Sequence, residues 1–294
     1  MKKKISLVML VSAITNIFLA ITKIIVGIIF KSGAIISDGI HSFSDLFTDV
    51  VSIIGNVLAR KPADKEHPYG HGKIEYLTSL IIGIVVVFVG VKVIITSFNN
   101  KILMPSIVVA IITIITIIAK LLLSSYIIKK GNEYNNNILI ASGKESRMDV
   151  ISSIVVFVSV LLMQLSDYIS VLKYSDKIAS IMVGLFIIKA GYGILKENAS
   201  IVLGKQETNE KCVSDIKRII KNTNDVLSIK SLIIMKFGHK SSLNLIITMD
   251  GNTTISDAHI VADEIEKNIK NYNRDIKYIN IHIEPDTKID NEKK

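Results

Sequence analysis

Residues 37–45 read Ser-Asp-Gly-Ile-His-Ser-Phe-Ser-Asp and lie inside an apolar run that extends from Gly33 to about Leu58. Ionisable side chains are unfavourable there, because a charged group at the centre of a bilayer costs roughly 2.5–3.5 kcal/mol on insertion scales. His41 and Asp45 are four residues apart, so a helix places them on one face, one turn from each other. An imidazole and a carboxylate on one face supply half of a tetrahedral metal site. The stretch therefore predicts a metal-binding position on a membrane-embedded helix.

A second pair of acidic residues, Glu145 and Asp149, has the same four-residue spacing further along the chain. One such pair alone is equally consistent with a polar contact between helices, but two pairs on separate helices favour an ion site. Together with His41 and Asp45 they offer three oxygen ligands and one nitrogen ligand. This set of donors disfavours copper and leaves Zn²⁺, Mn²⁺ or Fe²⁺ open. Because the ligands must be deprotonated, we expect metal binding to displace protons.

Six apolar segments approach the ~20 residues that a membrane-spanning helix needs. They cover residues 5–30, 34–58, 75–98, 103–128, 137–165 and 177–202. The connections near residues 2–4, 60–73 and 129–130 are the more basic ones, which by the positive-inside rule places both termini in the cytoplasm. We predict a multi-pass transmembrane domain over residues 1–204, in the cell inner (plasma) membrane.

After Gly204 the composition changes to that of a small domain outside the membrane. The pattern predicts helices at 210–221 and 254–272, the second capped by Thr254 or Ser256, and strands at 226–237, 241–249 and 277–284. This α-β-β-α-β order predicts a cytoplasmic ferredoxin-like α/β domain over residues 205–287, followed by a polar tail at 288–294. Three strands with one helical layer leave one sheet face open, which favours a homodimer.

Charge and cysteine content narrow the function classes. The formal net charge is +9, but no nucleic-acid-binding motif accompanies it, and in a membrane protein Lys and Arg more often meet anionic lipid headgroups. We therefore expect the lipid bilayer, and no nucleic acid, among the partners. The single cysteine, Cys212, excludes an intramolecular disulfide and a metal site made of cysteines.

Other acidic residues and histidines offer further ligands. One loop offers three candidate ligands within eight residues, namely Asp64, His67 and His71. The alternative is a solvated loop whose histidines are incidental. Asp38 and Asp49 lie on or near the helical face of the central pair, where they either relay ions or protons or line a wet crevice.

The cytoplasmic domain has its own candidate ligands. His282 and Glu284 are two apart on a predicted strand, so they point to the same face, and His259 lies on the second predicted helix. These residues either converge on a metal or include surface histidines without a partner.

Taken together, these motifs make the chain similar to the cation diffusion facilitator family of metal transporters. The resemblance covers nearly the whole chain and rests most specifically on residues 37–45, 67–75, 149–153 and 257–263. It implies a homodimeric antiporter that moves a divalent cation out of the cytoplasm against an inward flow of protons.

The resemblance also implies site residues. It assigns the transport site to His41, Asp45 and Asp149, and a loop site to Asp64, His67 and His71. It assigns a regulatory site in the cytoplasmic domain to His259, His282 and Glu284. The position of Glu145 is commonly a histidine in zinc-transporting members, so the glutamate here raises manganese or iron as the cargo.

The resulting prediction is a secondary active transporter that exports Zn²⁺, Mn²⁺ or Fe²⁺ by alternating access, with no catalytic residues and no catalytic cofactor. One alternative is a membrane-anchored metal sensor, but the acidic groups within two spans argue against a membrane part that serves only as an anchor. The other is an intramembrane metalloenzyme, against which stands the absence of a His-Glu-x-x-His motif and of a Ser/His or Cys/His arrangement.

Overall fold

The computed structural model describes residues 2–99, 104–134, 136–206, 209–238 and 240–286. The chain forms two compact units, one of Met1–Val51 and Ile81–Leu195, the other of Ser52–Leu80 and Lys196–Lys294. The polar tail predicted at 288–294 lies outside the described residues, and the domain boundary after residue 204 stays a prediction.

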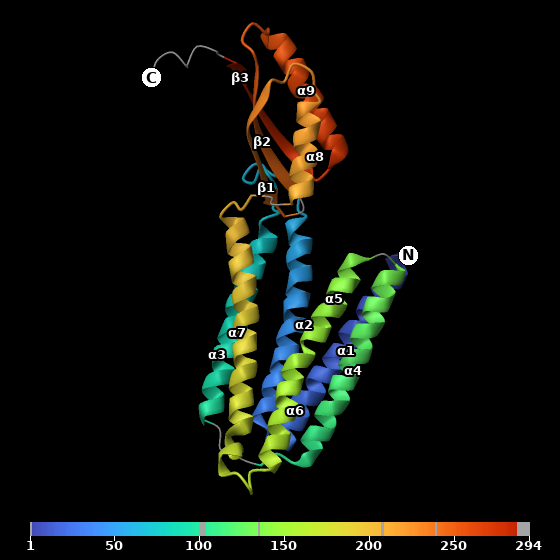
Figure 1. Ribbon diagram of the computed structural model, residues 1–294, viewed down its shortest axis with the longest axis vertical. Coiled ribbons are helices and arrows are strands. Elements are labelled where there is room, and N and C mark those ends of the chain that lie inside the picture. Colours follow the sequence, from blue (N-terminus) through green and yellow to red (C-terminus); the bar gives the residue numbers. More distant parts are fainter. Residues whose placement is uncertain (1, 100–103, 135, 207–208, 239, 287–294) are drawn as a thin grey trace. The chain divides into compact units, whose positions relative to one another are not determined.

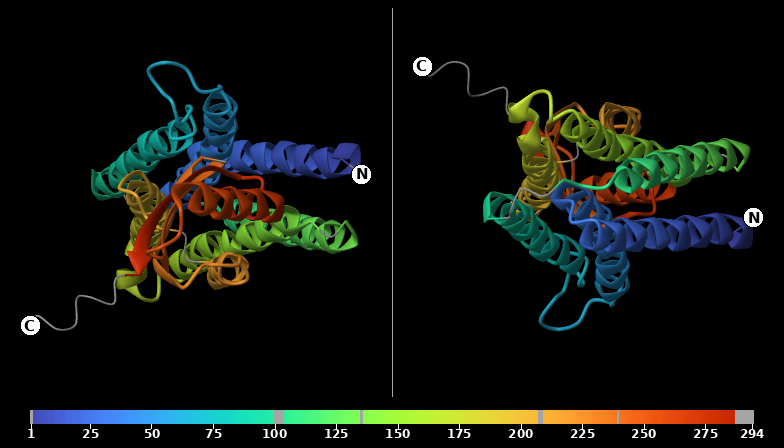
Figure 2. Two further views of the ribbon diagram at one scale, coloured as in Figure 1. Left: turned by 90° about the horizontal axis from the view of Figure 1, so that it is seen from above. Right: turned by 90° about the horizontal axis from the view of Figure 1, so that it is seen from below.

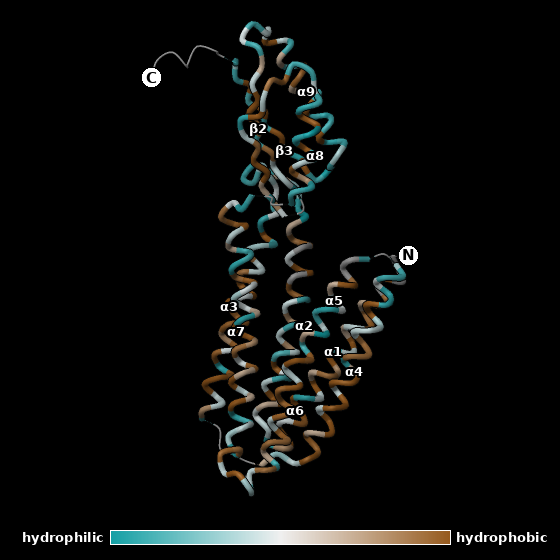
Figure 3. Tube along the Cα trace, viewed as in Figure 1, coloured by the Kyte–Doolittle hydropathy of each residue, from teal (hydrophilic) through white to brown (hydrophobic). Residues whose placement is uncertain are grey.

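Long apolar helices dominate the chain as far as residue 202 (Figure 1). They are α1 (Lys2–Ile29), α2 (Gly33–Ala59), α3 (Ile74–Asn99), α4 (Ile107–Glu133), α5 (Asn137–Met148), α6 (Val150–Gln164) and α7 (Ser175–Val202), the last preceded by a short 3₁₀ helix, η1 (Ser170–Tyr174). Within the part of the chain that the structure describes, six segments are long and apolar enough to cross a membrane. Figure 3 shows hydrophobic residues along most of their length. The predicted six-span architecture is confirmed.

The fifth predicted span contains two helices, α5 and α6, that meet at Asp149, which is itself a candidate ligand. Asp149 keeps right-handed helical backbone angles (φ −64°, ψ −20°), and its N–H donates to the Glu145 carbonyl at 3.1 Å, so the span continues through this residue. The Ser152 hydroxyl donates to the Asp149 carbonyl oxygen at 2.8 Å, and such a side-chain bond competes with the regular helical hydrogen bonds. The junction of α5 and α6 therefore lies directly at the candidate metal site.

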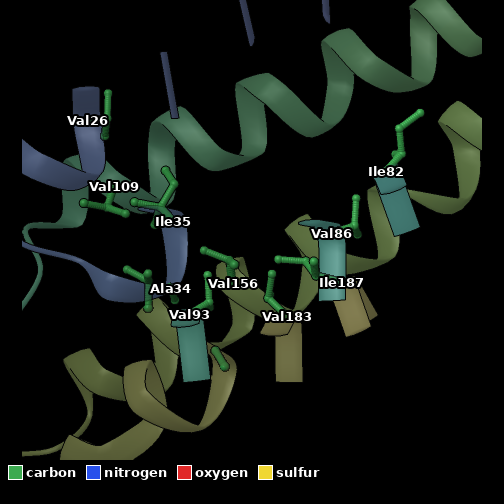
Figure 4. Close-up of a cluster of buried hydrophobic side chains, with 13 residues drawn as sticks. Val26, Ala34, Ile35, Ile82, Val86, Val93, Val109, Val156, Val183 and Ile187 are labelled. Atoms are coloured by element: carbon green, nitrogen blue, oxygen red, sulfur yellow. The ribbon is translucent and has the colours of Figure 1, made fainter. Parts of the chain in front are cut away.

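The first unit packs around aliphatic side chains from α1, α2, α3, α4, α6 and α7 (Figure 4). Its buried members include Val26, Ile35, Val86, Val156 and Val183, none more than 8% exposed. Within this unit α4 lies beside α1, α5 and α6 (Figure 2). Because lipid tails are as apolar as these side chains, close packing rather than the hydrophobic effect holds such helices together.

Glycines allow α3 and α7 to approach closely at two levels. A Cβ on Gly90 would lie 2.7 Å from Ile188 Cγ1 and 3.0 Å from the Gly184 carbonyl oxygen. At the other level, a Cβ on Gly83 would lie 3.2 Å from the carbonyl oxygen of Gly191. Small residues at a helix interface are the usual means of bringing two membrane helices together.

Replacing Gly90 with leucine should destabilise the first unit by about 1–3 kcal/mol, because the side chain would overpack the α3–α7 contact. Thermal unfolding of the purified protein in detergent measures this loss. The matched control is Gly193→Ala in α7, where an added Cβ meets nothing within 4 Å. An unchanged melting temperature for the leucine variant would contradict this packing.

In the second unit, two helices cover one face of a three-stranded sheet. The strands are β1 (Ser228–Phe237), β2 (Lys240–Asp250) and β3 (Ile276–Asp286), with β2 in the middle, antiparallel to β1 and parallel to β3. Leu243, Leu245 and Ile247 of β2 pack against α8 (Glu210–Lys221) and α9 (Ile255–Tyr272). Thr254 caps α9 by accepting from the Asp257 backbone N–H. The predicted α-β-β-α-β domain is confirmed.

Candidate metal sites

The first candidate site lies within the membrane part of the first unit. His41 and Asp45 of α2 and Asp149 at the α5–α6 junction offer ligand atoms that all lie within 4.8 Å of one another. His41 is 8% exposed, and its Nδ1 is 3.8 Å from Asp45 Oδ1. Residues more than 100 positions apart in the sequence thus present one nitrogen and two carboxylates to a common point. We call these three residues the ligand cluster.

The ligand cluster borders a cavity of about 290 Å³, to which it contributes Asp45 and Asp149. Among the described residues, the buried side-chain oxygen and nitrogen atoms without a hydrogen-bond partner are Asn16 Oδ1, Asp45 Oδ2 and Ser146 Oγ. All three residues line this cavity. Buried polar atoms rarely stay unpaired, because losing water without a new partner costs about 1–3 kcal/mol. An oxygen-seeking cation beside Asp45 would satisfy such an atom.

Glu145 and Asp49 line the same cavity but are not part of the ligand cluster. Glu145 precedes Asp149 by one helical turn, and its side chain is exposed to the cavity and its surroundings. Its role as the fourth ligand, and that of Asp49 as a relay, therefore stay predictions.

Sequence reasoning missed Lys120 of α4. Its side chain is 6% exposed, and its Nζ lies 2.9 Å from Asp149 Oδ2. The available signal was that Lys120 is the only charged residue between Ile107 and Ile128. A lone lysine in an apolar span predicts an acidic partner on another helix.

Asp38 is fully buried and is held by three donors. Lys23 Nζ lies 2.8 Å from its carboxylate, and the hydroxyls of Ser152 and Ser153 donate to it at 2.6 and 2.7 Å. This network joins α1, α2 and α6 beside the ligand cluster. The arrangement favours a positioning role for Asp38, whereas the predicted relay role stays a prediction.

The second candidate site is in the second unit, in the loop that joins α2 to α3. Ligand atoms of Asp64, His67 and His71 also lie within 4.8 Å of one another. His67 Nδ1 is 3.2 Å from Asp64 Oδ1, and His71 Nε2 is 3.3 Å from Asp64 Oδ2. His71 Nδ1 faces the Pro62 carbonyl at 3.1 Å, which favours the tautomer that leaves Nε2 free to bind a metal. The backbone N–H of His67 lowers the pKa of Asp64, which favours the ionised carboxylate.

This loop packs on the β1–β2 hairpin of the same unit. Tyr69 stacks on Phe237 with ring centroids 5.4 Å apart, and the Tyr76 hydroxyl donates to the Gly238 carbonyl at 3.2 Å. Lys73 Nζ lies 5.0 Å from the centre of the Phe237 ring. These contacts hold Tyr69, Lys73 and Tyr76 against the hairpin, whereas Asp64 and His67 are exposed, and metal binding by the loop stays a prediction.

The third predicted site does not form a ligand cluster like the other two within the described residues, but His259, His282 and Glu284 line one pocket of the second unit. His259 Nε2 lies 3.7 Å from Asp263, and His282 Nε2 lies 3.8 Å from Glu284, which also pairs with Lys230. Ile281 and Ile283 of β3 pack against the core under the helices, and His282 lies between them on the strand. Convergence of His259 and His282 on one metal stays a prediction.

Comparison with known proteins agrees with this architecture. Residues 9–203 match the cation efflux transmembrane domain, and residues 208–286 match the cation efflux protein cytoplasmic domain.

Three relatives cover most of the chain. The manganese efflux system protein MneP of Bacillus subtilis is 30% identical over 285 residues, 95% of each chain. The uncharacterized transporter MJ0449 of Methanocaldococcus jannaschii is 30% identical over 90% of this chain and 91% of its own. The manganese efflux system protein MneS of B. subtilis is 25% identical over 94% of each chain. These are transporters, not enzymes.

A six-span membrane part, a ferredoxin-like domain and matches to both family domains all point the same way. The chain is a multi-pass membrane protein and belongs to the cation efflux, or cation diffusion facilitator, family of divalent-metal transporters.

Proposed function

We propose that the protein exports a divalent cation from the cytoplasm in exchange for protons, with His41, Asp45, Glu145 and Asp149 as the transport site. The observation that carries this proposal is the ligand cluster beside a polar cavity within the membrane part. Ionisable groups inside a membrane span mark ion or proton pathways in most transporters.

The chemistry of the ligands supports coupling to protons. Carboxylates and a neutral imidazole bind the cation from the cytoplasmic side, and protons arriving from the other side compete for the same atoms. Alternating exposure of the cavity to the two sides of the plasma membrane would then exchange metal for protons. The basic connections between the spans support a cytoplasmic location for both termini.

We favour manganese as the cargo over iron and zinc. Glu145 makes the set of donors rich in oxygen, and carboxylate oxygens suit Mn²⁺ better than soft ligands do. The names of the relatives MneP and MneS point to the same metal.

Replacing Glu145 with histidine should shift transport from manganese toward zinc, because a second imidazole makes the site softer. We expect the ratio of Zn²⁺ to Mn²⁺ flux to rise about tenfold, the result of a change of about 1.4 kcal/mol in relative affinity. Glu145→Gln, which keeps an oxygen donor, is the matched control. An unchanged ratio in a folded Glu145→His protein would remove Glu145 from the site.

We further propose that the protein works as a homodimer and that its cytoplasmic part senses the metal. The face of the sheet opposite α8 and α9 carries polar residues such as Asn244, Asn280 and His282 and offers a surface for a second copy. In this proposal Asp64, His67 and His71 form the loop site, and His259, His282 and Glu284, which line one pocket, form a regulatory site.

Flux into proteoliposomes under an imposed pH gradient tests the proposal. We expect Mn²⁺ uptake into vesicles that are acidic inside, and a loss of uptake when an ionophore collapses the gradient. A metal sensor or an intramembrane metalloenzyme would give no flux at all. Mn²⁺ uptake at the same rate with and without the pH gradient would still show transport of the metal but would exclude its exchange for protons.

A further inference from the structure

Lys120 is the one side chain of α4 that brings a positive charge to the cavity among the described residues. It is 5% exposed and lies with its Nζ 2.9 Å from Asp149 Oδ2. The contact joins α4 to the junction of α5 and α6. The Lys120 ammonium is therefore a positive charge of the protein itself that lies beside a carboxylate oxygen of the ligand cluster.

The other charged groups around the cavity show why this lysine stands apart. The acidic side chains that line it are Asp45, Asp49, Glu145 and Asp149, and the basic ones are Lys23 and Lys120. Lys23 is engaged with Asp38 at 2.8 Å and with the hydroxyl of Ser153 at 2.9 Å. Lys120 is thus the lysine that faces the carboxylates of the proposed transport site.

We propose that Lys120 is a resident counter-ion of the transport site, holding Asp149 until an incoming divalent cation displaces its ammonium. This inference rests on the proposed function, because it takes Asp149 as a ligand. Its consequence is a lower affinity for the metal and a faster release.

The physical basis is competition between two cations for one carboxylate. Metal binding must break the Lys120–Asp149 pair and then tolerate a positive charge a few ångströms away, which weakens binding more in a cavity than in water. A lysine suits this role, since its compact ammonium sits on a flexible four-carbon stem that can swing aside. A transported ion must bind well enough to enter and weakly enough to leave.

The competing explanation is that Lys120 only neutralises Asp149 to stabilise the fold. Under that explanation, removing the lysine lowers stability and leaves metal affinity unchanged or weaker. The counter-ion role predicts the opposite change in affinity, so a binding measurement separates the two.

The experiment is a calorimetric titration of full-length protein with Mn²⁺ in detergent at pH 8. All proteins carry His67→Ala and His71→Ala, so that the loop site contributes no heat. We expect Lys120→Met to lower the Kd for Mn²⁺ about tenfold, equivalent to about 1.4 kcal/mol, and to slow Mn²⁺ flux in proteoliposomes. Lys120→Gln, which lacks the charge but keeps a polar amide, should tighten binding in the same direction.

Two further variants serve as controls. Lys120→Arg keeps the charge and should bind Mn²⁺ close to the affinity of the parent protein. Lys189→Met removes a lysine from an exposed position of α7 outside the cavity lining and should leave the Kd unchanged.

The outcomes distinguish this inference from the proposed function. An unchanged or higher Kd in folded Lys120→Met or Lys120→Gln protein would overturn the counter-ion role while the transport site stands. Undiminished Mn²⁺ binding by Asp149→Ala protein would instead overturn the transport site itself.

Discussion

Replacing Asp149 with alanine should abolish metal flux while the protein stays folded. Asp149 supplies one of the three ligands that meet within 4.8 Å, and its loss leaves two. Mutating even the outer partners of metal ligands lowers affinity or activity 10–100-fold, so losing a ligand should reduce flux by at least about 100-fold. Asp45→Ala should have the same effect, because Asp45 Oδ2 is buried without a hydrogen-bond partner among the described residues.

The measurement is initial Mn²⁺ uptake into proteoliposomes, normalised to the folded protein in each preparation. Glu264→Ala, which removes an exposed carboxylate from α9 of the cytoplasmic domain, is the control and should transport normally. Normal uptake by folded Asp149→Ala protein would refute the assignment of the site.

The second large effect concerns stability. Asp38→Ala should destabilise the protein by about 3–5 kcal/mol, because it leaves the buried Lys23 ammonium without its carboxylate. Thermal unfolding in detergent, followed by circular dichroism, measures the loss. The comparison is Glu266→Ala, which breaks an exposed pair with Lys270 and should cost less than about 1 kcal/mol.

The double variant Lys23→Met/Asp38→Leu separates the buried charge from the loss of packing. Removing both partners of a buried ion pair is often neutral or stabilising, so much of the lost stability should return. A double variant less stable than Asp38→Ala would show that the charge on Lys23 is not the source of the destabilisation.

The elements that sequence reasoning predicted well are those that local pattern determines. The six spans follow from apolar length alone, and α8 begins and ends at the predicted residues 210 and 221. The cap at Thr254 follows from a hydroxyl placed before an amphipathic run. The pairing of His41 with Asp45 required only the spacing of a helix turn.

What the sequence did not reveal depends on contacts between distant segments. The Ser152 hydroxyl meets the Asp38 carboxylate only because α2 and α6 pack together, which local pattern does not show. The partner of Lys120 could not be chosen among the acidic residues of the other spans before their packing was known. That His259 and His282 line one pocket depends on how α9 packs beside β3, which the spacing of these residues in the sequence does not show.

The magnetic resonance of bound Mn²⁺ can show whether His41 is one of its ligands. The chain has six histidines, so replacing the other five with alanine leaves His41 as the only imidazole. Pulsed electron paramagnetic resonance of Mn²⁺ bound to this variant should show the coupling of a single imidazole nitrogen, which disappears on further replacement of His41 with alanine. Bound Mn²⁺ that lacks any imidazole coupling, in a variant that still transports the metal, would contradict the claim that the cation is carried by His41, Asp45 and Asp149.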